Sequence, residues 1–247
     1  MLGLEIVEKP VAGPGIAALD IDVYLAVIEE AQAREIPFAV GGSLAMAAHC
    51  GLLRNSKDLD LYVLPEDAPG MIRALTDLGF EDYYSRLPYD RGWIYRACKD
   101  ELIVDVIWAM ANRRADVDRG WLERAQEIEA GGKRFHLLSV EEMIWSKLYV
   151  FQRDRCDWPD ILNLVDCARR RLDWDYLASR LSDDLPLLKG ILQVYQWLRP
   201  GVLAGNPRWM RDGEAGDGVP SADITRRRAA LLDSRAWLVC LEDGNGC

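Results

Sequence analysis

The sequence predicts an α+β fold, with a mixed β-sheet flanked by helices and followed by a C-terminal α-helical domain. Short apolar runs typical of strands concentrate before residue 139, and helical patterns fill most of the chain after it. The 247 residues are enough for two modest domains. We therefore expect an α/β domain over 1–138 and an α-helical domain over 139–247, with a Gly/Pro-rich loop near 200–219.

The first half alternates helices and strands. Residues 1–14 predict an extended arm, and apolar residues at helical spacing over 16–34 predict an amphipathic helix. The next elements in order are a strand 38–40, a helix 43–53 with Ser43 as N-cap, a strand 59–64, a helix 66–78 ending at Gly79, and strands 81–84, 93–98 and 101–108. The polar pair Lys99-Asp100 predicts that the last two strands form a hairpin.

The second half opens with one more hairpin and then becomes helical. Gly131-Gly132-Lys133 separates two strand-like runs, which predicts the hairpin. Ser139 and Glu142 have the spacing of a capping box, so a helix should begin at Val140 and run to about Asp154. The other predicted helices are 114–122, 160–171, 174–181, 187–198 and 221–239.

Composition narrows the classes of function. The net charge of -10 disfavours nucleic-acid binding through bulk charge, although the arginine clusters 169–171 and 226–228 are either local basic patches or solvated helix ends. Six cysteines without a C-x-x-C pair, and only two histidines, disfavour a zinc site. No apolar run approaches the roughly 18 residues that span a membrane, so we expect a cytoplasmic protein with free thiols.

The stretch from Phe38 to Leu64 contains the strongest functional signal. Gly41, Gly42 and Ser43 form a turn at a predicted helix start, where backbone N–H groups and the helix dipole suit a phosphate. Asp58 and Asp60 stand two apart in a strand, so their side chains share one face, and paired carboxylates suit Mg2+. A phosphate turn beside metal carboxylates indicates phosphoryl or nucleotidyl transfer.

A third carboxylate, Asp105, lies in the apolar run Leu102–Trp108. An ionised carboxylate in an apolar strand is costly unless it is paired. If this strand lies beside the Asp58/Asp60 strand, the three carboxylates meet and can hold two Mg2+ ions. The alternative is that Asp105 pairs with an arginine from elsewhere in the chain.

The order of these motifs resembles the nucleotidyltransferase superfamily with the polymerase-beta-like fold. The segments GGSLAMAAHCGLLRNSKDLDLYV, ELIVDVIW and EEMIWSKLYVFQRDRCDWPDIL are similar to the motifs of its bacterial abortive-infection and toxin–antitoxin branch. The resemblance covers about residues 36–166 and implies a nucleotidyltransferase-like sheet.

The resemblance also implies a ligand set. Asp58, Asp60 and Asp105 would be the catalytic metal ligands of a two-ion Mg2+ site, and a nucleoside triphosphate (NTP) would lie on the Gly41-Gly42-Ser43 turn. The basic residues that would reach its phosphates are Lys57, Lys147 and Arg153, and the remaining fourth-motif positions are Arg155, Asp157 and Asp160. The alternatives are that Lys57 only balances nearby carboxylates, that Lys147 is solvated, and that Arg153 and Arg155 form salt bridges.

The function implied is transfer of a nucleoside monophosphate from an NTP to a hydroxyl acceptor, with release of pyrophosphate. The acceptor would be a tRNA, a protein or a small molecule. A toxin role would add an antitoxin as partner, and a homo-oligomer is a further expectation. The alternative function is a non-catalytic module of the same fold that binds a nucleotide or a partner.

Overall fold

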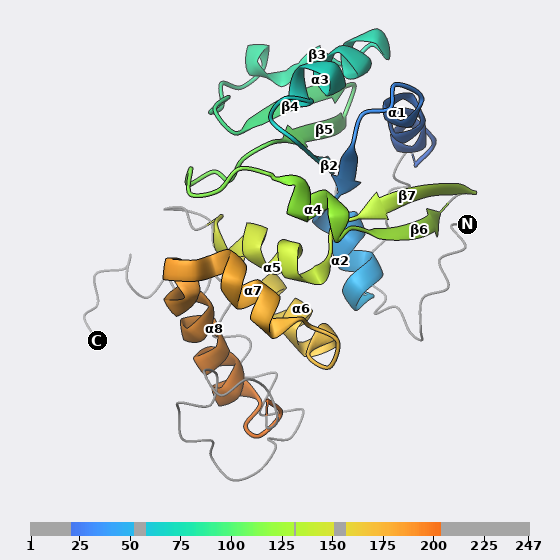
Figure 1. Cartoon of the computed structure of the whole chain (residues 1–247). Helices are drawn as coiled ribbons and strands as arrows, with labels where there is room; N and C mark the ends of the chain where they lie inside the picture. Colours follow the sequence, from blue (N-terminus) through green and yellow to red (C-terminus); the bar gives the residue numbers. More distant parts are fainter. Residues whose placement is uncertain (1–20, 52–57, 131, 151–156, 204–247) are drawn as a thin grey trace. The chain divides into compact units, whose positions relative to one another are not determined.

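The computed structural model describes residues 21–51, 58–130, 132–150 and 157–203 (Figure 1). The predicted arm 1–14 and helix 221–239 lie outside these residues, as does most of the predicted loop 200–219. The chain divides into two compact units, residues 1–143 and 144–247.

The first unit is built on a seven-stranded mixed sheet with the order β3-β4-β5-β2-β1-β7-β6. The strands are β1 (Phe38–Val40), β2 (Asp58–Val63), β3 (Glu81–Asp82), β4 (Ile94–Lys99), β5 (Leu102–Ile107), β6 (Gln126–Ala130) and β7 (Lys133–Leu137). The pairs β2–β5 and β1–β7 are parallel, and the other neighbours are antiparallel. The predicted mixed sheet is therefore confirmed, and so are both hairpins.

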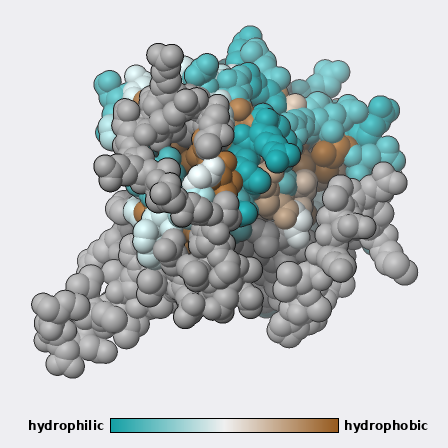
Figure 2. All heavy atoms as spheres, turned by 90° about the horizontal axis from the view of Figure 1, so that it is seen from below, coloured by the Kyte–Doolittle hydropathy of each residue, from teal (hydrophilic) through white to brown (hydrophobic). Residues whose placement is uncertain are grey.

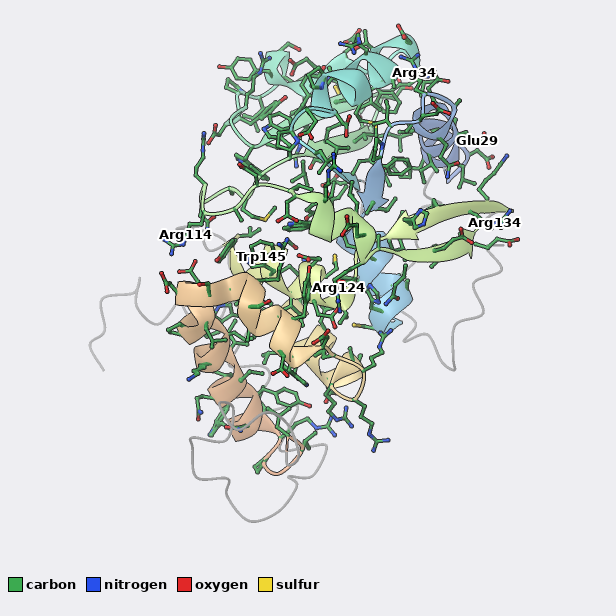
Figure 3. All side chains as sticks on the ribbon, viewed as in Figure 1. Glu29, Arg34, Arg114, Arg124, Arg134 and Trp145 are labelled. Carbon is green, nitrogen blue, oxygen red and sulfur yellow. The ribbon has the colours of Figure 1, made fainter. Side chains whose placement is uncertain are left out.

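The helices of the first unit are α1 (Ile21–Ala33), α2 (Gly42–Cys50), α3 (Ala68–Asp77) and α4 (Arg119–Glu123), with a short 3-10 helix, η1 (Tyr83–Ser85). Apolar side chains of α1 and α3 pack in one core with Leu59, Leu61, Val104 and Val106 of the sheet. Because strand side chains alternate, Asp58, Asp60 and Asp105 lie on the other face. Arg34, labelled in Figure 3, donates hydrogen bonds to Glu30 and, at 2.7 Å, to Asp77 at the end of α3.

The second unit is helical over its described residues, as the sequence predicts. It contains the end of α5 (Val140–Leu148), which the unit boundary crosses, and then α6 (Trp158–Ala168), α7 (Trp174–Leu181), the 3-10 helix η2 (Ser182–Asp184) and α8 (Leu185–Leu198). Helices α6 and α8 contact each other and bury apolar side chains such as Leu164 and Ile191. Asp166 of α6 accepts hydrogen bonds from Tyr195 and Arg199 near the end of α8.

Several element predictions were wrong in detail. Ser43 does not cap α2, because Gly41 is the N-cap and no side chain accepts a hydrogen bond there. The predicted helix 114–122 is helical only from Arg119, since Asp116 forms an isolated bridge with Ala109. The predicted strand 81–84 gives way to η1 at Tyr83, where the Asp82 side chain caps the turn.

Helix ends account for the remaining differences. Helix α5 begins at Val140, and Ser139 accepts a hydrogen bond from the Glu142 N–H at 3.3 Å, as the capping box predicts. It ends at Leu148, well before the predicted Asp154. Gly79 follows α3 with a φ of 82°, the left-handed conformation expected of a glycine at a helix end.

The described surface is mostly polar on the face drawn in Figure 2, where smaller hydrophobic areas lie between hydrophilic side chains. Four large apolar or aromatic side chains are prominently exposed among the described residues, namely Tyr84, Leu87, Leu187 and Trp197. None of the helices in the described part of the chain is both long enough and apolar enough to cross a membrane.

Candidate functional site

The Gly41-Gly42 turn connects β1 directly to α2. The Gly41 N–H donates a hydrogen bond to the backbone carbonyl of Asp60 at 2.9 Å, which fixes the turn against β2. Gly42 has a φ of 57°, a conformation that glycine adopts without the penalty a side chain would impose. The turn therefore lies beside Asp60, although the two are separated by the whole of α2.

The Asp60 carboxylate fills the space where a side chain at position 42 would be. A Cβ atom built on Gly42 would lie 1.7 Å from Asp60 Oδ2, and one built on Gly41 would lie 2.4 Å from the Tyr62 ring. Glycine is needed at both positions because the Asp60 and Tyr62 side chains of β2 occupy the space that a Cβ atom would fill. The predicted phosphate turn at Gly42 and the predicted metal ligand Asp60 are therefore in direct contact.

Asp105 is the neighbour of Asp60 across the β2–β5 pair. The parallel register places Asp60 opposite Asp105, and the antiparallel β4–β5 register places Asp105 opposite Arg96. Directly opposed residues on adjacent strands project to the same face. Asp60, Asp105 and Arg96 therefore form a row of charged side chains across three strands, and Asp58 precedes it on β2.

Arg96 and Asp105 form a bidentate pair in which Asp105 is buried and Arg96 is partly exposed. The Arg96 Nε donates to Asp105 Oδ1 at 2.7 Å, and its Nη2 donates to Oδ2 at 2.6 Å. The Asp105 residue is only 3% exposed. The hydrogen bonds with Asp105 raise the pKa of Arg96, burial opposes this, and the charges of Asp105, Asp58 and Asp60 raise it further. The sequence left open that Asp105 pairs with an arginine, and the structure contains that pair.

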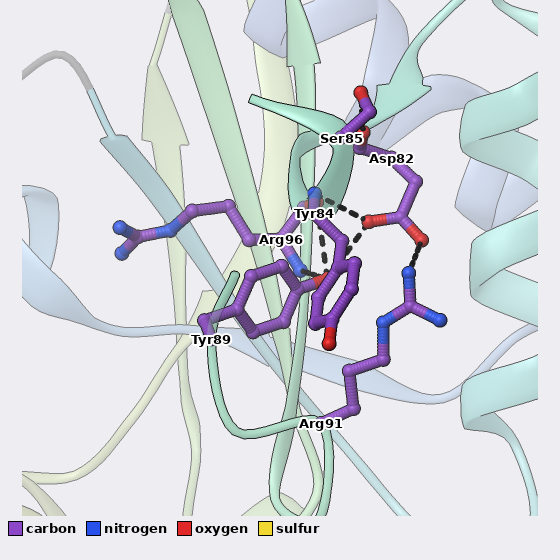
Figure 4. Close-up of polar contacts among 6 residues, drawn as sticks. All are labelled: Asp82, Tyr84, Ser85, Tyr89, Arg91 and Arg96. Carbon is purple, nitrogen blue, oxygen red and sulfur yellow. Dashed lines mark hydrogen bonds and ion pairs between the residues drawn. The ribbon is translucent and has the colours of Figure 1, made fainter. Parts of the chain in front are cut away.

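Arg96 is held from behind by the loop that follows η1. The Tyr89 hydroxyl accepts a hydrogen bond from the Arg96 backbone N–H at 2.9 Å and donates to the Asp82 carboxylate at 3.1 Å. Arg91 also pairs with Asp82 and stacks on the Tyr84 ring. In Figure 4 the Arg96 guanidinium points away from this cluster, so the loop fixes the backbone while the side chain reaches Asp105.

Tyr24 of α1 reports on the charge near Asp58. It is 1% exposed, and its pKa is raised to about 12, first by burial and then by the Asp58 carboxylate. A folded pKa above the ordinary value of about 10 contributes stability that is complete below pH 10 and is lost as the pH rises through about 12. Between pH 9 and 11 we expect the unfolding free energy of the wild type to fall by about 1 kcal/mol more than that of Tyr24→Phe. Urea unfolding at each pH measures the difference, and parallel curves for the two proteins would contradict the shift.

The other predicted site residues differ in what the structure says of them. Ser43 follows Gly42 in the first turn of α2, and Lys57, Arg153 and Arg155 are outside the described residues. Lys147 belongs to the second unit, where its side chain is 11% exposed and pairs with Asp160 at 2.7 Å and Asp157 at 3.1 Å. The fourth motif therefore brings its own lysine and acids together, and its role toward phosphates stays a prediction.

The described donors provide two neighbouring carboxylates, Asp58 and Asp60, for a metal ion at the turn. Over residues 21–51, 58–130, 132–150 and 157–203, no group of three or more His, Cys, Asp or Glu side chains is arranged to hold a metal ion. Asp58 and Asp60 are half-buried and alternate with buried leucines on β2. Mg2+ is commonly held by one or two carboxylates, with phosphate oxygens and water as its other ligands. Asp58 and Asp60 would fit that requirement if phosphate binds as predicted, because Asp60 contacts Gly42 of the predicted phosphate turn.

Sequence reasoning missed Arg96. The predicted turn at Lys99-Asp100 would place Cys98 opposite Glu101 and therefore Arg96 opposite Ile103. In the structure the turn lies one residue later, which places Lys99 opposite Leu102 and Arg96 opposite Asp105. A cation directly across an antiparallel pair from a buried carboxylate is the expected neutralising partner.

The chain was compared with known proteins. No curated protein matches it. Among solved structures, the antibiotic-resistance factor ANT(2'')-Ia is 18% identical with a TM-score of 0.49, over 69% of this chain and 95% of that one. The lincosamide antibiotic adenylyltransferase LnuA is 14% identical with a TM-score of 0.43, over 58% and 94%. JHP933 from Helicobacter pylori is 15% identical with a TM-score of 0.41, over 90% and 96%.

The comparison with family models gives the assignment. Residues 24–194 match the model of a family described as uncharacterised nucleotidyltransferase. This range includes the glycine turn, the three carboxylates and Lys147. Because the match spans well over half of the 247 residues, the chain belongs to this nucleotidyltransferase family.

Proposed function

We propose that this protein transfers a nucleoside monophosphate from an NTP to a hydroxyl acceptor in a reaction that depends on Mg2+. The observation that carries the proposal is the contact of the Asp60 carboxylate with Gly42 at the start of α2, with Asp105 in the next strand. A helix N-terminus attracts phosphate, and a carboxylate beside it provides a ligand for the cation that accompanies a triphosphate.

The residues at the turn and on the adjacent strands have different proposed roles. Backbone N–H groups at Gly42 and Ser43 bind the phosphates, while Asp58 and Asp60 hold Mg2+. When bound, Mg2+ neutralises charge on the triphosphate and polarises the phosphoryl group that is attacked. A carboxylate has about four lone-pair sites, and Arg96 uses two on Asp105, so Asp105 retains capacity to orient the acceptor hydroxyl and accept its proton.

The acceptor classes proposed are a small molecule, a protein or a tRNA, and the net charge of -10 favours the first two over the tRNA. The decisive experiment incubates the full chain with each α-labelled NTP and Mg2+ in three sets of acceptors, namely aminoglycosides and lincosamides, total protein, and tRNA. We expect label in one set and none when EDTA replaces Mg2+. Binding of NTP without transfer to any set would favour the non-catalytic module. If expression also arrests growth, the toxin role and its antitoxin partner gain support.

Gly42→Ala tests the contact between the turn and β2. The new methyl group would meet Asp60 Oδ2 at 1.7 Å and Cγ at 2.7 Å, so the whole carboxylate must move. Displacing a reacting group by about 1 Å can reduce the rate about 10²-fold, and we expect a loss of that order. Because Gly42 has a positive φ, the alanine side chain should also lower the unfolding free energy by about 1–2 kcal/mol.

The matched control is Gly190→Ala in α8. A Cβ built there meets nothing within 4 Å, so this variant should keep the wild-type rate. It should also gain about 0.5–1 kcal/mol of stability, because alanine replaces glycine within a helix. Rate measurements and thermal melts on both variants make the comparison. Equal transfer rates for the two would show that the position of the Asp60 carboxylate at the turn does not matter for the reaction.

A further inference from the structure

We propose that Arg96 is a positioning residue that takes the place of a second divalent cation, so that this site holds one Mg2+ on Asp58 and Asp60. The proposal rests on the proposed function and replaces the two-ion site that the motif resemblance implies. It assigns Asp105 to the guanidinium and to the acceptor instead of to a metal.

The first argument is the geometry of Asp105. Both of its oxygens accept hydrogen bonds from one guanidinium, at 2.7 and 2.6 Å, and the Asp105 side chain is 4% exposed against 32% for Arg96. Fork-to-fork pairs of this kind are among the stronger polar contacts in proteins. The lone pairs that Asp105 retains can accept a neutral hydroxyl group, whereas a second metal ion bound to them would lie beside a cation that already contacts both oxygens.

The second argument is charge. An arginine side chain does not lose its proton in a protein, so the positive charge at position 96 is permanent. A second divalent ion on Asp105 would lie beside this fixed guanidinium, whose Nη2 is 2.6 Å from Asp105 Oδ2. Like charges repel strongly at short range in a partly buried site.

The third argument is that Arg96 is built into the fold. Its backbone N–H is bound by Tyr89, which is tied to Asp82, and Asp82 is paired with Arg91. Its strand is paired with β5 along its whole length from Ile94 to Lys99. These contacts fix the backbone of Arg96 beside β5, and the two hydrogen bonds from its guanidinium hold the charge at Asp105.

The test counts metal ions on the full-length protein with Mn2+ as the probe, by measuring the electron paramagnetic resonance signal of the free ion during a titration. We expect one Mn2+ per chain for the wild type. Arg96→Gln removes the fixed charge and should bind a second ion, whereas Arg96→Lys keeps the charge and should bind one.

A neutral double variant protects the test against misfolding. Arg96→Gln with Asp105→Asn removes both charges and leaves two side chains that can hydrogen bond, so no buried charge is left unpaired. It should bind one Mn2+ with the wild-type affinity. A loss of about tenfold or more, as expected when a metal site is disturbed, would show that Asp105 is a ligand and overturn the proposal. Two ions on the wild type would overturn it as well.

The proposed function fails in a different way. Asp60→Asn should abolish the single Mn2+ site if the chain is a metal-dependent transferase. If the wild type binds no Mn2+, or if Asp60→Asn does not abolish the Mn2+ binding, the proposed function is wrong. If two ions bind and Asp60→Asn removes both, the function stands and only the role of Arg96 is wrong.

Discussion

Asp60→Asn is expected to reduce nucleotidyl transfer by about 10³-fold or more, which corresponds to about 4 kcal/mol of transition-state stabilisation. Asparagine keeps the size of the side chain and its fit against Gly42, so the loss would come from the charge alone. Asp60 lies opposite Asp105 and two residues from Asp58, so the substitution removes one of three neighbouring carboxylates.

The rate is measured with labelled NTP at saturating Mg2+, and a thermal melt of the same sample reports stability. Asp90→Asn is the matched control, because it removes an exposed carboxylate that pairs with Arg113 at 2.8 Å and should leave the rate unchanged. An Asp60→Asn enzyme whose rate stays within about tenfold of the wild type would exclude Asp60 from the reaction.

Arg96→Met is expected to cost about 3–5 kcal/mol of unfolding free energy, because it leaves the buried Asp105 carboxylate without its guanidinium. Methionine retains most of the apolar length of arginine, so packing changes little. A typical domain is stable by only about 5–15 kcal/mol, so a loss of this size would lower the melting temperature severely.

The control for this stability effect is Arg134→Met at the tip of the β6–β7 hairpin (Figure 3). Arg134 pairs with Glu127 at 3.8 Å and both side chains are largely exposed, so its removal should cost about 0–1 kcal/mol. The double variant Arg96→Met with Asp105→Leu should recover most of the lost stability, since it leaves no unpaired charge. Urea unfolding compares the proteins. Equal losses for Arg96→Met and Arg134→Met would mean that Asp105 finds another partner.

Local patterns predicted the parts of the site that depend on one element. The alternation of Asp58 and Asp60 with Leu59 and Leu61 correctly predicted which face of β2 each side chain occupies. The leucines pack in the core on one face, and the period of two places both aspartates on the other. The Ser43 cap was wrong for the opposite reason. Helix α2 starts at Gly42, which contacts the Asp60 carboxylate. This contact joins residues far apart in the sequence, and the composition of the turn does not predict it.

Longer-range features depended on strand pairing. That β2 lies beside β5 could be stated only as a condition, since α3, β3 and β4 intervene and several sheet orders accommodate them. The Arg96 contact depends on the exact turn of the β4–β5 hairpin, because a shift of one residue from Lys99-Asp100 changes the residue opposite Arg96 from Ile103 to Asp105. The partners of Lys147 lie at the start of α6, beyond residues 151–156, so helical spacing along α5 could not identify them.

The β4–β5 hairpin has a consequence for how the chain folds. Arg96 and Asp105 are nine residues apart, whereas Asp60 must wait for a pairing across 45 residues. Closing a short loop costs less entropy than closing a long one, so we expect the β4–β5 hairpin to form before β5 pairs with β2. In that order the Asp105 carboxylate would have its guanidinium partner before the sheet buries it, and no unpaired charge would enter the core.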